Sequence, residues 1–304
     1  MNTATPQRRI TAPKAQLGLA LAVLIGEIAI TFTGAVVRVT GSGLGCDTWP
    51  NCHEGSLIPV EGAAPWIHQL IEFGNRGLAV VLGLVVGLLL LAVYLAGRRS
   101  VVKAHAWYQL IGVIFQAVLG GISVHLDLKW WAVAIHFLPS IILIWLAALL
   151  YEHVKAPDEG HDEWRYPRPL RYLAVGSAAA LSAVLITGTM VTGAGVHSGD
   201  STKGMEGRLE VDIAGMAHVH AGFMYLYLGL TIGLVVALIT VRSSQRSRKL
   251  GYLLIFFIVL QAAVGMIQFW FGVPRWTVPF HVVLSGVVTA YTALLYAAGR
   301  ERVA

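Results

Sequence analysis

The sequence predicts an all-α membrane protein, with eight transmembrane helices arranged as two parallel, pseudo-symmetric four-helix bundles. Three observations lead to this fold class: the composition, eight long apolar segments, and an internal repeat. Hydrophobic residues make up 56% of the 304 residues and charged residues only 12%, whereas a soluble domain is about one-quarter charged. The net charge is +6, but the sequence contains no soluble basic domain that could bind nucleic acid. We therefore expect membrane lipid as a partner and no nucleic acid.

Eight segments are long enough to cross the hydrocarbon layer, which takes about 20 apolar residues each. Within lipid, a helix is the only open-chain structure that satisfies its own backbone. The expected spans are residues 17–37, 66–96, 106–125, 131–151, 171–193, 214–241, 250–271 and 277–298.

Basic residues gather before the first span, after the last, and in every second loop between. Short loops rich in Lys and Arg stay on the cytoplasmic side, so both termini are expected to be cytoplasmic in a multi-pass plasma-membrane protein. Arg8, Arg9 and Lys14 lead into a full-length first span, so no cleavable signal peptide is expected. The loop 38–65 is then expected on the extracytoplasmic side.

That loop contains "GLGCDTWPNC" (residues 43–52), with the only two cysteines of the chain, Cys46 and Cys52. An oxidising compartment permits a disulfide, and a small closed loop, structural or redox-active, is the favoured interpretation. A metal site with His53 and Asp47 is the alternative, but a second cysteine pair and close ligand spacing are missing.

The chain is a tandem repeat. Residues 105–151 match residues 250–296 at an offset of 145, and "TGAVVRVTGSGL" (33–44) answers "TGTMVTGAGV" (187–196) with two residues missing. Four spans per copy give both copies the same orientation. The predicted domains are 1–155, a linker 156–170, and 171–304. The equivalent pairs include Gln116 with Gln261, Gly120 with Gly265, Trp131 with Trp276, and His136 with His281.

Ionisable side chains inside spans are costly and are functional candidates. In "HVH", His218 and His220 point about 200° apart on a helix, and the repeat offset places His220 over Asn75, so His220 is expected to face inward and His218 outward. Four-helix bundles hold cofactors between facing helices. His220 and His281 therefore predict a bis-histidine haem site.

The first half carries a different set of polar and ionisable side chains in its second span. His68, Glu72 and Asn75 stand at i, i+4 and i+7 and share one helix face. An ion pair between Glu72 and Arg76 is the simple explanation of that carboxylate. Glu27, in the first span, is expected to hydrogen-bond Thr31.

The motifs together resemble the haem A synthase (CtaA-like) family over essentially the whole chain. They are "VRVTGSGLGCDTWPNC", "IEFGNR", "AVAIHF", "HVH" and "VPFHVV". The resemblance implies a membrane haem-dependent oxidoreductase that oxidises the C8 methyl group of haem O to a formyl group through an alcohol and a geminal diol. It also implies a haem pocket in each half and haem O synthase as an upstream partner.

The resemblance assigns roles to residues of this chain. His220 and His281 become axial ligands of a resident haem b, and His136 becomes the ligand of the substrate haem. Glu72 becomes the catalytic acid–base group, with Asn75, His68 and Arg76 around the substrate. Two departures stand out: Asn75 occupies a place where the family commonly has histidine, and Ser198 answers Cys46.

Two other classes compete with the enzyme. A di-haem b-type cytochrome fed by quinol would explain the histidines, but it predicts the same ligation in both halves, which Asn75 contradicts. A transporter would carry paired charges at mid-membrane, whereas most charges here lie near the outward ends. The sequence leaves open the electron donor and any homo-oligomer.

Overall fold

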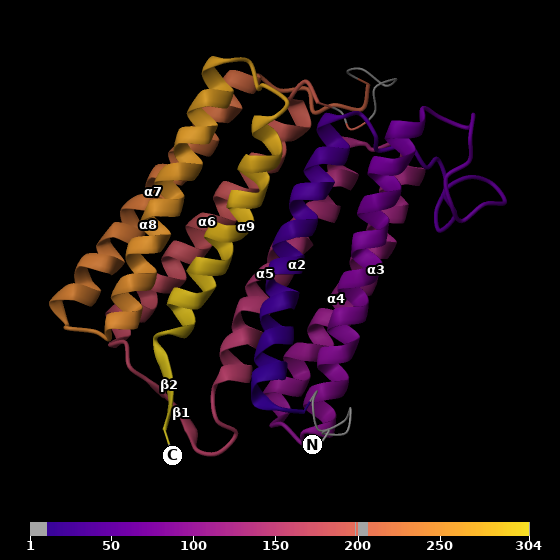
Figure 1. The fold of residues 1–304 in the computed structure, drawn as a ribbon. Coiled ribbons are helices and arrows are strands. Elements are labelled where there is room, and N and C mark those ends of the chain that lie inside the picture. Colours follow the sequence, from indigo (N-terminus) through magenta and orange to yellow (C-terminus); the bar gives the residue numbers. More distant parts are fainter. Residues whose placement is uncertain (1–10, 198, 200–205, 304) are drawn as a thin grey trace.

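In a computed structural model, which describes residues 11–197, 199 and 206–303, eight helices account for most of the described residues (Figure 1). Arg8, Arg9 and Ser198 lie outside these residues. The helices are α2 (Pro13–Val39), α3 (Trp66–Leu95), α4 (Ser100–His125), α5 (Trp130–Lys155), α6 (Arg168–Ala194), α7 (Ile213–Thr240), α8 (Gln245–Trp270) and α9 (Thr277–Ala297).

All eight helices are long and apolar enough to cross a membrane, which confirms the eight predicted spans among the described residues. Several begin earlier than their apolar segments do. For example, α4 starts at Ser100, six residues before the segment expected from hydropathy. The helical backbone continues past the lipid-facing stretch because its hydrogen bonds are internal and do not depend on side-chain polarity.

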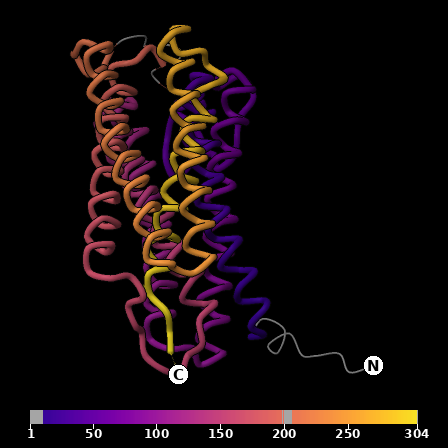
Figure 2. Tube along the Cα trace, turned by 90° about the vertical axis from the view of Figure 1, so that its left-hand side faces the viewer, coloured from indigo at the N-terminus to yellow at the C-terminus, as the bar shows by residue number. Residues whose placement is uncertain are grey.

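The helices form two rings of four that run roughly parallel (Figures 1 and 2). In the first ring α2 contacts α3, α3 contacts α4, α4 contacts α5, and α5 contacts α2; helices α6 to α9 repeat the pattern. Helices α3 and α5 therefore face each other across the first ring, as α7 and α9 do across the second. This arrangement agrees with the predicted pseudo-symmetry, while the domain bounds stay a prediction.

Helix α9 joins the two rings. It contacts α2 and α5 of the first ring, and half of its spanning window is buried, against 17% for the peripheral α8. Ala290 and Ala293 of α9 pack into the same apolar core as Val23 and Ile144 of the first ring. The second core surrounds Tyr227, whose buried hydroxyl meets Thr292 of α9 at 2.5 Å. Helix α9 thus contributes side chains to the apolar cores of both rings.

The start of α2 and the end of the chain lie at one end of the bundle, and the loop 40–65 lies at the other (Figure 1). Near the chain end, β1 (His161–Trp164), inside the predicted linker, pairs antiparallel with β2 (Arg300–Val303). The guanidinium groups of Arg171 and Arg300 both lie over the Trp164 ring, 4.6 and 4.2 Å from its centroid. The linker and the C-terminal strand are thereby tied together.

Arg98 organises the same end of the first ring. Its guanidinium donates to Asp158, to the Gln16 side chain, and to the backbone carbonyls of Val154 and Ala156. Partial burial alone would favour the neutral acid, but hydrogen bonds from Arg98 and from the Arg99 amide hold the pKa of Asp158 below its usual value.

Substituting Arg98 by alanine should destabilise the first ring, because two carbonyls and a glutamine oxygen lose their donor. We expect a loss of about 1–3 kcal/mol, seen as a lower thermal unfolding midpoint in detergent. Arg168→Ala, at an exposed position, is the control. Equal midpoints for the two variants would contradict this role.

Candidate functional site

Two imidazoles face each other inside the second ring. The ring centroids of His220 on α7 and His281 on α9 are 6.5 Å apart, with an angle of 61° between their planes. A first-row metal lies about 2 Å from an imidazole nitrogen, so two imidazoles on opposite sides of one metal have centroids about 6.4 Å apart. The observed separation fits one metal ion between the rings.

The His220 ring is oriented from α6. Its Nδ1 lies 2.9 Å from the Val184 carbonyl oxygen and 3.2 Å from the Thr187 hydroxyl. A carbonyl only accepts, so Nδ1 carries the proton and Nε2 keeps its lone pair, as a metal ligand requires. A Cβ on Gly188 would come within 3.1 Å of the ring. The small glycine therefore lets the imidazole lie against α6.

The His281 ring lies against α8 in the same way. A Cβ on Gly265 would come within 3.2 Å of its Cε1, and Gln261 donates to the His281 carbonyl at 2.9 Å. The Nδ1 of His281 is buried and has no hydrogen-bond partner among the described residues. This Nδ1 lies on the α8 side of the ring, 3.8 Å from where a Cβ of Gly265 would be, so Nε2 is the nitrogen that can face a metal between the two imidazoles.

The described part of the chain contains no group of three or more His, Cys, Asp or Glu side chains that could hold a metal ion. Two imidazoles alone leave most coordination positions of a metal open. A group that fits here must therefore bring its other ligands with it, as the four nitrogens of a porphyrin do.

The first ring repeats this frame with one change. The Thr33 hydroxyl donates to the Asn75 amide oxygen at 2.6 Å, where the second ring has Thr187 beside His220. Opposite, His136 on α5 lies against Gly120 of α4, and its Nδ1 is buried without a partner among the described residues. The first ring thus holds one inward imidazole and one amide.

The exchange of histidine for asparagine leaves room. A Cβ built on Gly34, the repeat equivalent of Gly188, meets nothing within 4 Å. Asparagine is shorter than histidine, and its amide oxygen is already engaged by Thr33. We call the space between Asn75 and His136 the first pocket, and that between His220 and His281 the second pocket. The first pocket is therefore open on the side where the second pocket has an imidazole.

Glu72 and Arg76 form the expected ion pair, with 2.6 Å between Nη2 and Oε1. The pair also holds the loop 40–65 that carries Cys46 and Cys52, which we call the cysteine loop. The sequence did not indicate this contact. Glu72 Oε2 accepts from the Cys46 amide at 2.8 Å. Arg76 donates to three loop carbonyls, those of Cys46, Thr48 and Asn51. The carboxylate therefore lies between the first pocket's helix and the loop.

The predicted disulfide between Cys46 and Cys52 is present. His53 and Asp47 do meet, at 2.9 Å, but the other ring nitrogen of His53 bonds to Gln69. These contacts give His53 a structural role and leave it no position for a metal.

The loop docks mainly on the first ring, and the Gly43 amide also donates to the Gly199 carbonyl of the second half at 2.6 Å. A Cβ on Gly121 of α4 would collide with the Trp49 ring, and one on Gly45 would collide with the His68 carbonyl. The His68 side chain bonds to Ser42 at 2.8 Å, so it supports the loop. Backbone contacts this close depend on glycine.

Two further expectations have clear outcomes. His218 is exposed, as expected, and contacts Phe269 on α8. The hydrogen bond expected between Glu27 and Thr31 is wrong. Thr31 donates to the Ile28 carbonyl, because a helical threonine readily bonds to the preceding turn. Glu27 is 2% exposed and its Oε1 has no hydrogen-bond partner among the described residues.

Residues 18–293 match a family of known proteins, COX15-CtaA, described as cytochrome oxidase assembly protein. The chain belongs to this family. The match includes both pockets and the cysteine loop, so the family resemblance carried by the motifs is confirmed.

Curated relatives agree. The "Heme A synthase" of Exiguobacterium sibiricum is 29% identical over 256 residues, 78% of this chain and 81% of that protein. That of Alkalihalophilus pseudofirmus is 32% identical over 152 residues, 48% of each chain. A "Protoheme IX farnesyltransferase" of Thermus thermophilus is 39% identical over 89 residues, 29% of this chain but only 13% of that protein.

Glu72→Ala should loosen the cysteine loop, because the Cys46 amide and Arg76 both lose their acceptor. We expect amide hydrogen exchange at Cys46 to accelerate by about tenfold or more. Glu72→Gln keeps an oxygen for the Cys46 amide and should stay closer to the unsubstituted protein. Unchanged exchange in Glu72→Ala would show that the disulfide alone holds the loop.

Proposed function

We propose that the protein is a haem A synthase, which oxidises the C8 methyl group of haem O to a formyl group. Family membership indicates the reaction class, and the observation that carries the assignment is the unequal pair of pockets. The second ring offers two imidazoles at a metal-spanning separation, and the first offers one imidazole and an open side. A resident cofactor suits the former, and a substrate the latter.

In the second ring, His220 and His281 would hold haem b. The bound haem would supply one-electron transfer. The protein would fix both imidazoles. Val184 holds the His220 ring in one tautomer, and Gly188 and Gly265 let the two rings lie close to α6 and α8. The apolar second core around Tyr227 lies further along the same two helices, α7 and α9.

In the first ring, His136 would bind the iron of haem O, and Asn75 would leave the opposite side accessible. Glu72 lies one helical turn from Asn75 on α3. Its carboxylate can hold or deliver a proton, while Arg76 fixes its position. His68, through Ser42, and Arg76, through the loop carbonyls, keep the loop over this half.

Haem O synthase is the upstream partner that we propose, since it makes the substrate. The relative named "Protoheme IX farnesyltransferase", in which a stretch similar to this chain makes up a small part, supports that association. The cysteine loop is proposed to lie on the extracytoplasmic side of the plasma membrane. A di-haem electron carrier is disfavoured because Asn75 makes the two pockets differ.

His220→Ala or His281→Ala should strip haem b from the purified protein, because one imidazole alone binds the iron weakly. Pyridine haemochrome analysis measures the loss. The matched control is His218→Ala, two residues from His220 but exposed, which should keep its haem. Full low-spin haem in the His281 variant would refute the assignment.

Glu72→Gln should reduce haem A formation from haem O by about 100-fold or more, because the amide cannot carry a proton. Haem b content should not change. Arg76→Gln, which disturbs the same loop but leaves the carboxylate, should lose less. The assay is chromatographic haem analysis of membranes with and without a haem O source. Equal losses in the two variants would make Glu72 a loop clamp only, and absence of haem A in the unsubstituted protein would refute the proposed function.

A further inference from the structure

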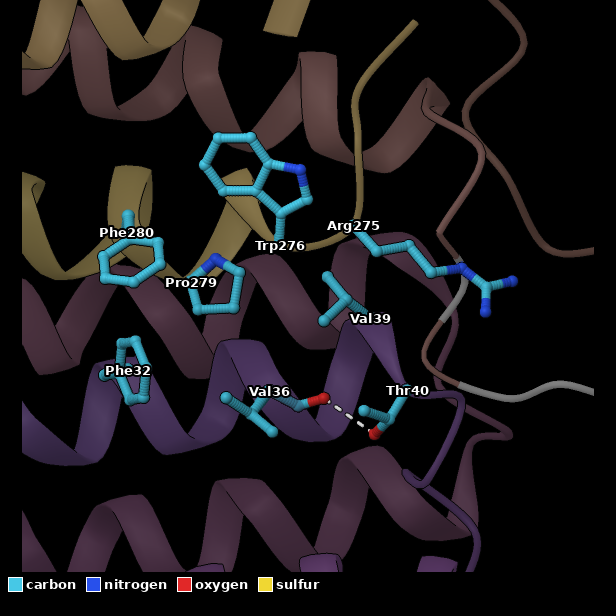
Figure 3. Close-up of a pocket in the computed structure, with 8 residues that line it drawn as sticks. All are labelled: Phe32, Val36, Val39, Thr40, Arg275, Trp276, Pro279 and Phe280. Carbon is cyan, nitrogen blue, oxygen red and sulfur yellow. Dashed lines mark hydrogen bonds between the residues drawn. The ribbon is translucent and has the colours of Figure 1, made fainter.

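A pocket of about 360 Å³ lies where the two rings meet, between the last turns of α2 and the start of α9 (Figure 3). Its volume is within the range of ligand-binding sites. The rings of Phe32 and Phe280 meet edge to face at one side of it, 5.8 Å apart. The lining residues are Phe32, Val36, Val39, Thr40, Arg275, Trp276, Pro279 and Phe280.

The repeat provides a second position equivalent to this pocket, and there the space is filled. At the equivalent junction of α5 with α6, the Trp130 ring packs against Gly193, so closely that a Cβ there would lie 2.9 Å from it. The repeat offset places Arg275 at the position of Trp130. The arginine leaves open the space that an indole fills in the other copy.

The chemistry of the walls limits the occupant. Seven of the eight lining side chains are apolar or already satisfied: the one hydroxyl, that of Thr40, bonds to the Val36 carbonyl and to Ser42. No lining residue offers a carboxylate or an imidazole to a quinol head group. Arg275, the one charged lining residue, extends its guanidinium away from Phe32 and Phe280 (Figure 3), so an uncharged hydrocarbon chain is the ligand that matches the apolar side of the pocket.

Two lining residues are sequence neighbours of residues in the two proposed haem sites, and two aromatic ones are exposed at the surface. Phe32 directly precedes Thr33, which holds Asn75, and Phe280 directly precedes His281. Trp276 and Phe280, at the start of α9, are 65% and 51% exposed. Exposed apolar side chains on a spanning helix face lipid. A chain lying in the pocket can therefore enter from the bilayer.

We propose that this pocket holds the farnesyl chain of the substrate porphyrin. The inference rests on the proposed function, whose substrate, haem O, differs from protohaem by that chain. Burial of an isoprenoid against the two phenylalanines would favour haem O over protohaem in the first ring and would fix the rotation of the porphyrin about the His136–iron axis. The methyl group to be oxidised is then presented in one orientation.

The test fills the pocket. Val36→Leu and Val36→Phe form a graded series, and Ile25→Phe, at a 57% exposed position of the same helix, is the control. Haem O and protohaem are titrated separately into protein that retains haem b, with binding followed by the Soret band. We expect the dissociation constant of haem O to rise in the order Leu, Phe, by about tenfold for Val36→Phe, while that of protohaem stays unchanged.

Each result decides the matter. Equal affinity for haem O and protohaem in the unsubstituted protein, or equal weakening of both in the Val36 variants, would overturn the proposal. Loss of a tightly held phospholipid from the variants, with haem O affinity unchanged, would assign the pocket to a lipid acyl chain. If Val36→Phe loses haem b through misfolding, Val36→Leu carries the test. Absence of haem A formation with discrimination intact would count against the proposed function alone.

Discussion

Burying an imidazole among apolar helices is costly unless its nitrogens find partners, and this constraint bears on the interior of both rings. An unsatisfied polar group in an apolar environment costs several kcal/mol by transfer estimates. The chain meets part of that demand itself, through the Val184 carbonyl on His220. It leaves the Nδ1 of His136 and of His281 without partners among the described residues. A group bound between the rings would explain why such histidines are kept there.

The second theme is asymmetry within a symmetric frame. Residues around the inward side chains recur in both rings: Thr33 contacts Asn75 as Thr187 contacts His220, and Gly120 lies against His136 as Gly265 lies against His281. Two substitutions break the symmetry: asparagine for histidine at Asn75, and arginine for tryptophan at Arg275. The first puts an amide in place of an imidazole, and the second lies at the pocket between the rings. Duplication explains the shared frame, and under the proposed function these exchanges would separate a cofactor site from a substrate site.

The fold was predictable because its signals are local and repeated. Apolar length gave the spans, and the fixed offset of the repeat paired His136 with His281 and placed His220 inward. The equivalence of Thr33 and Thr187 was also visible in that alignment, but their contacts with Asn75 and His220 come only from the structure. The clamp from Glu72 and Arg76 to the loop was not predictable, because its acceptors and donors are backbone groups with no side-chain signature. Glu27 was misjudged because a threonine one turn away has a nearer carbonyl to bond.

The central claim is that the second helix ring coordinates iron through two imidazoles and the first helix ring through one. Electron paramagnetic resonance of purified ferric protein, first with its resident haem and then after addition of haem O, tests it most directly. The account predicts a low-spin signal of bis-imidazole type that is present from the start and a high-spin signal that appears only with haem O. Two equivalent low-spin signals, or a folded protein without a resident low-spin haem, would contradict it.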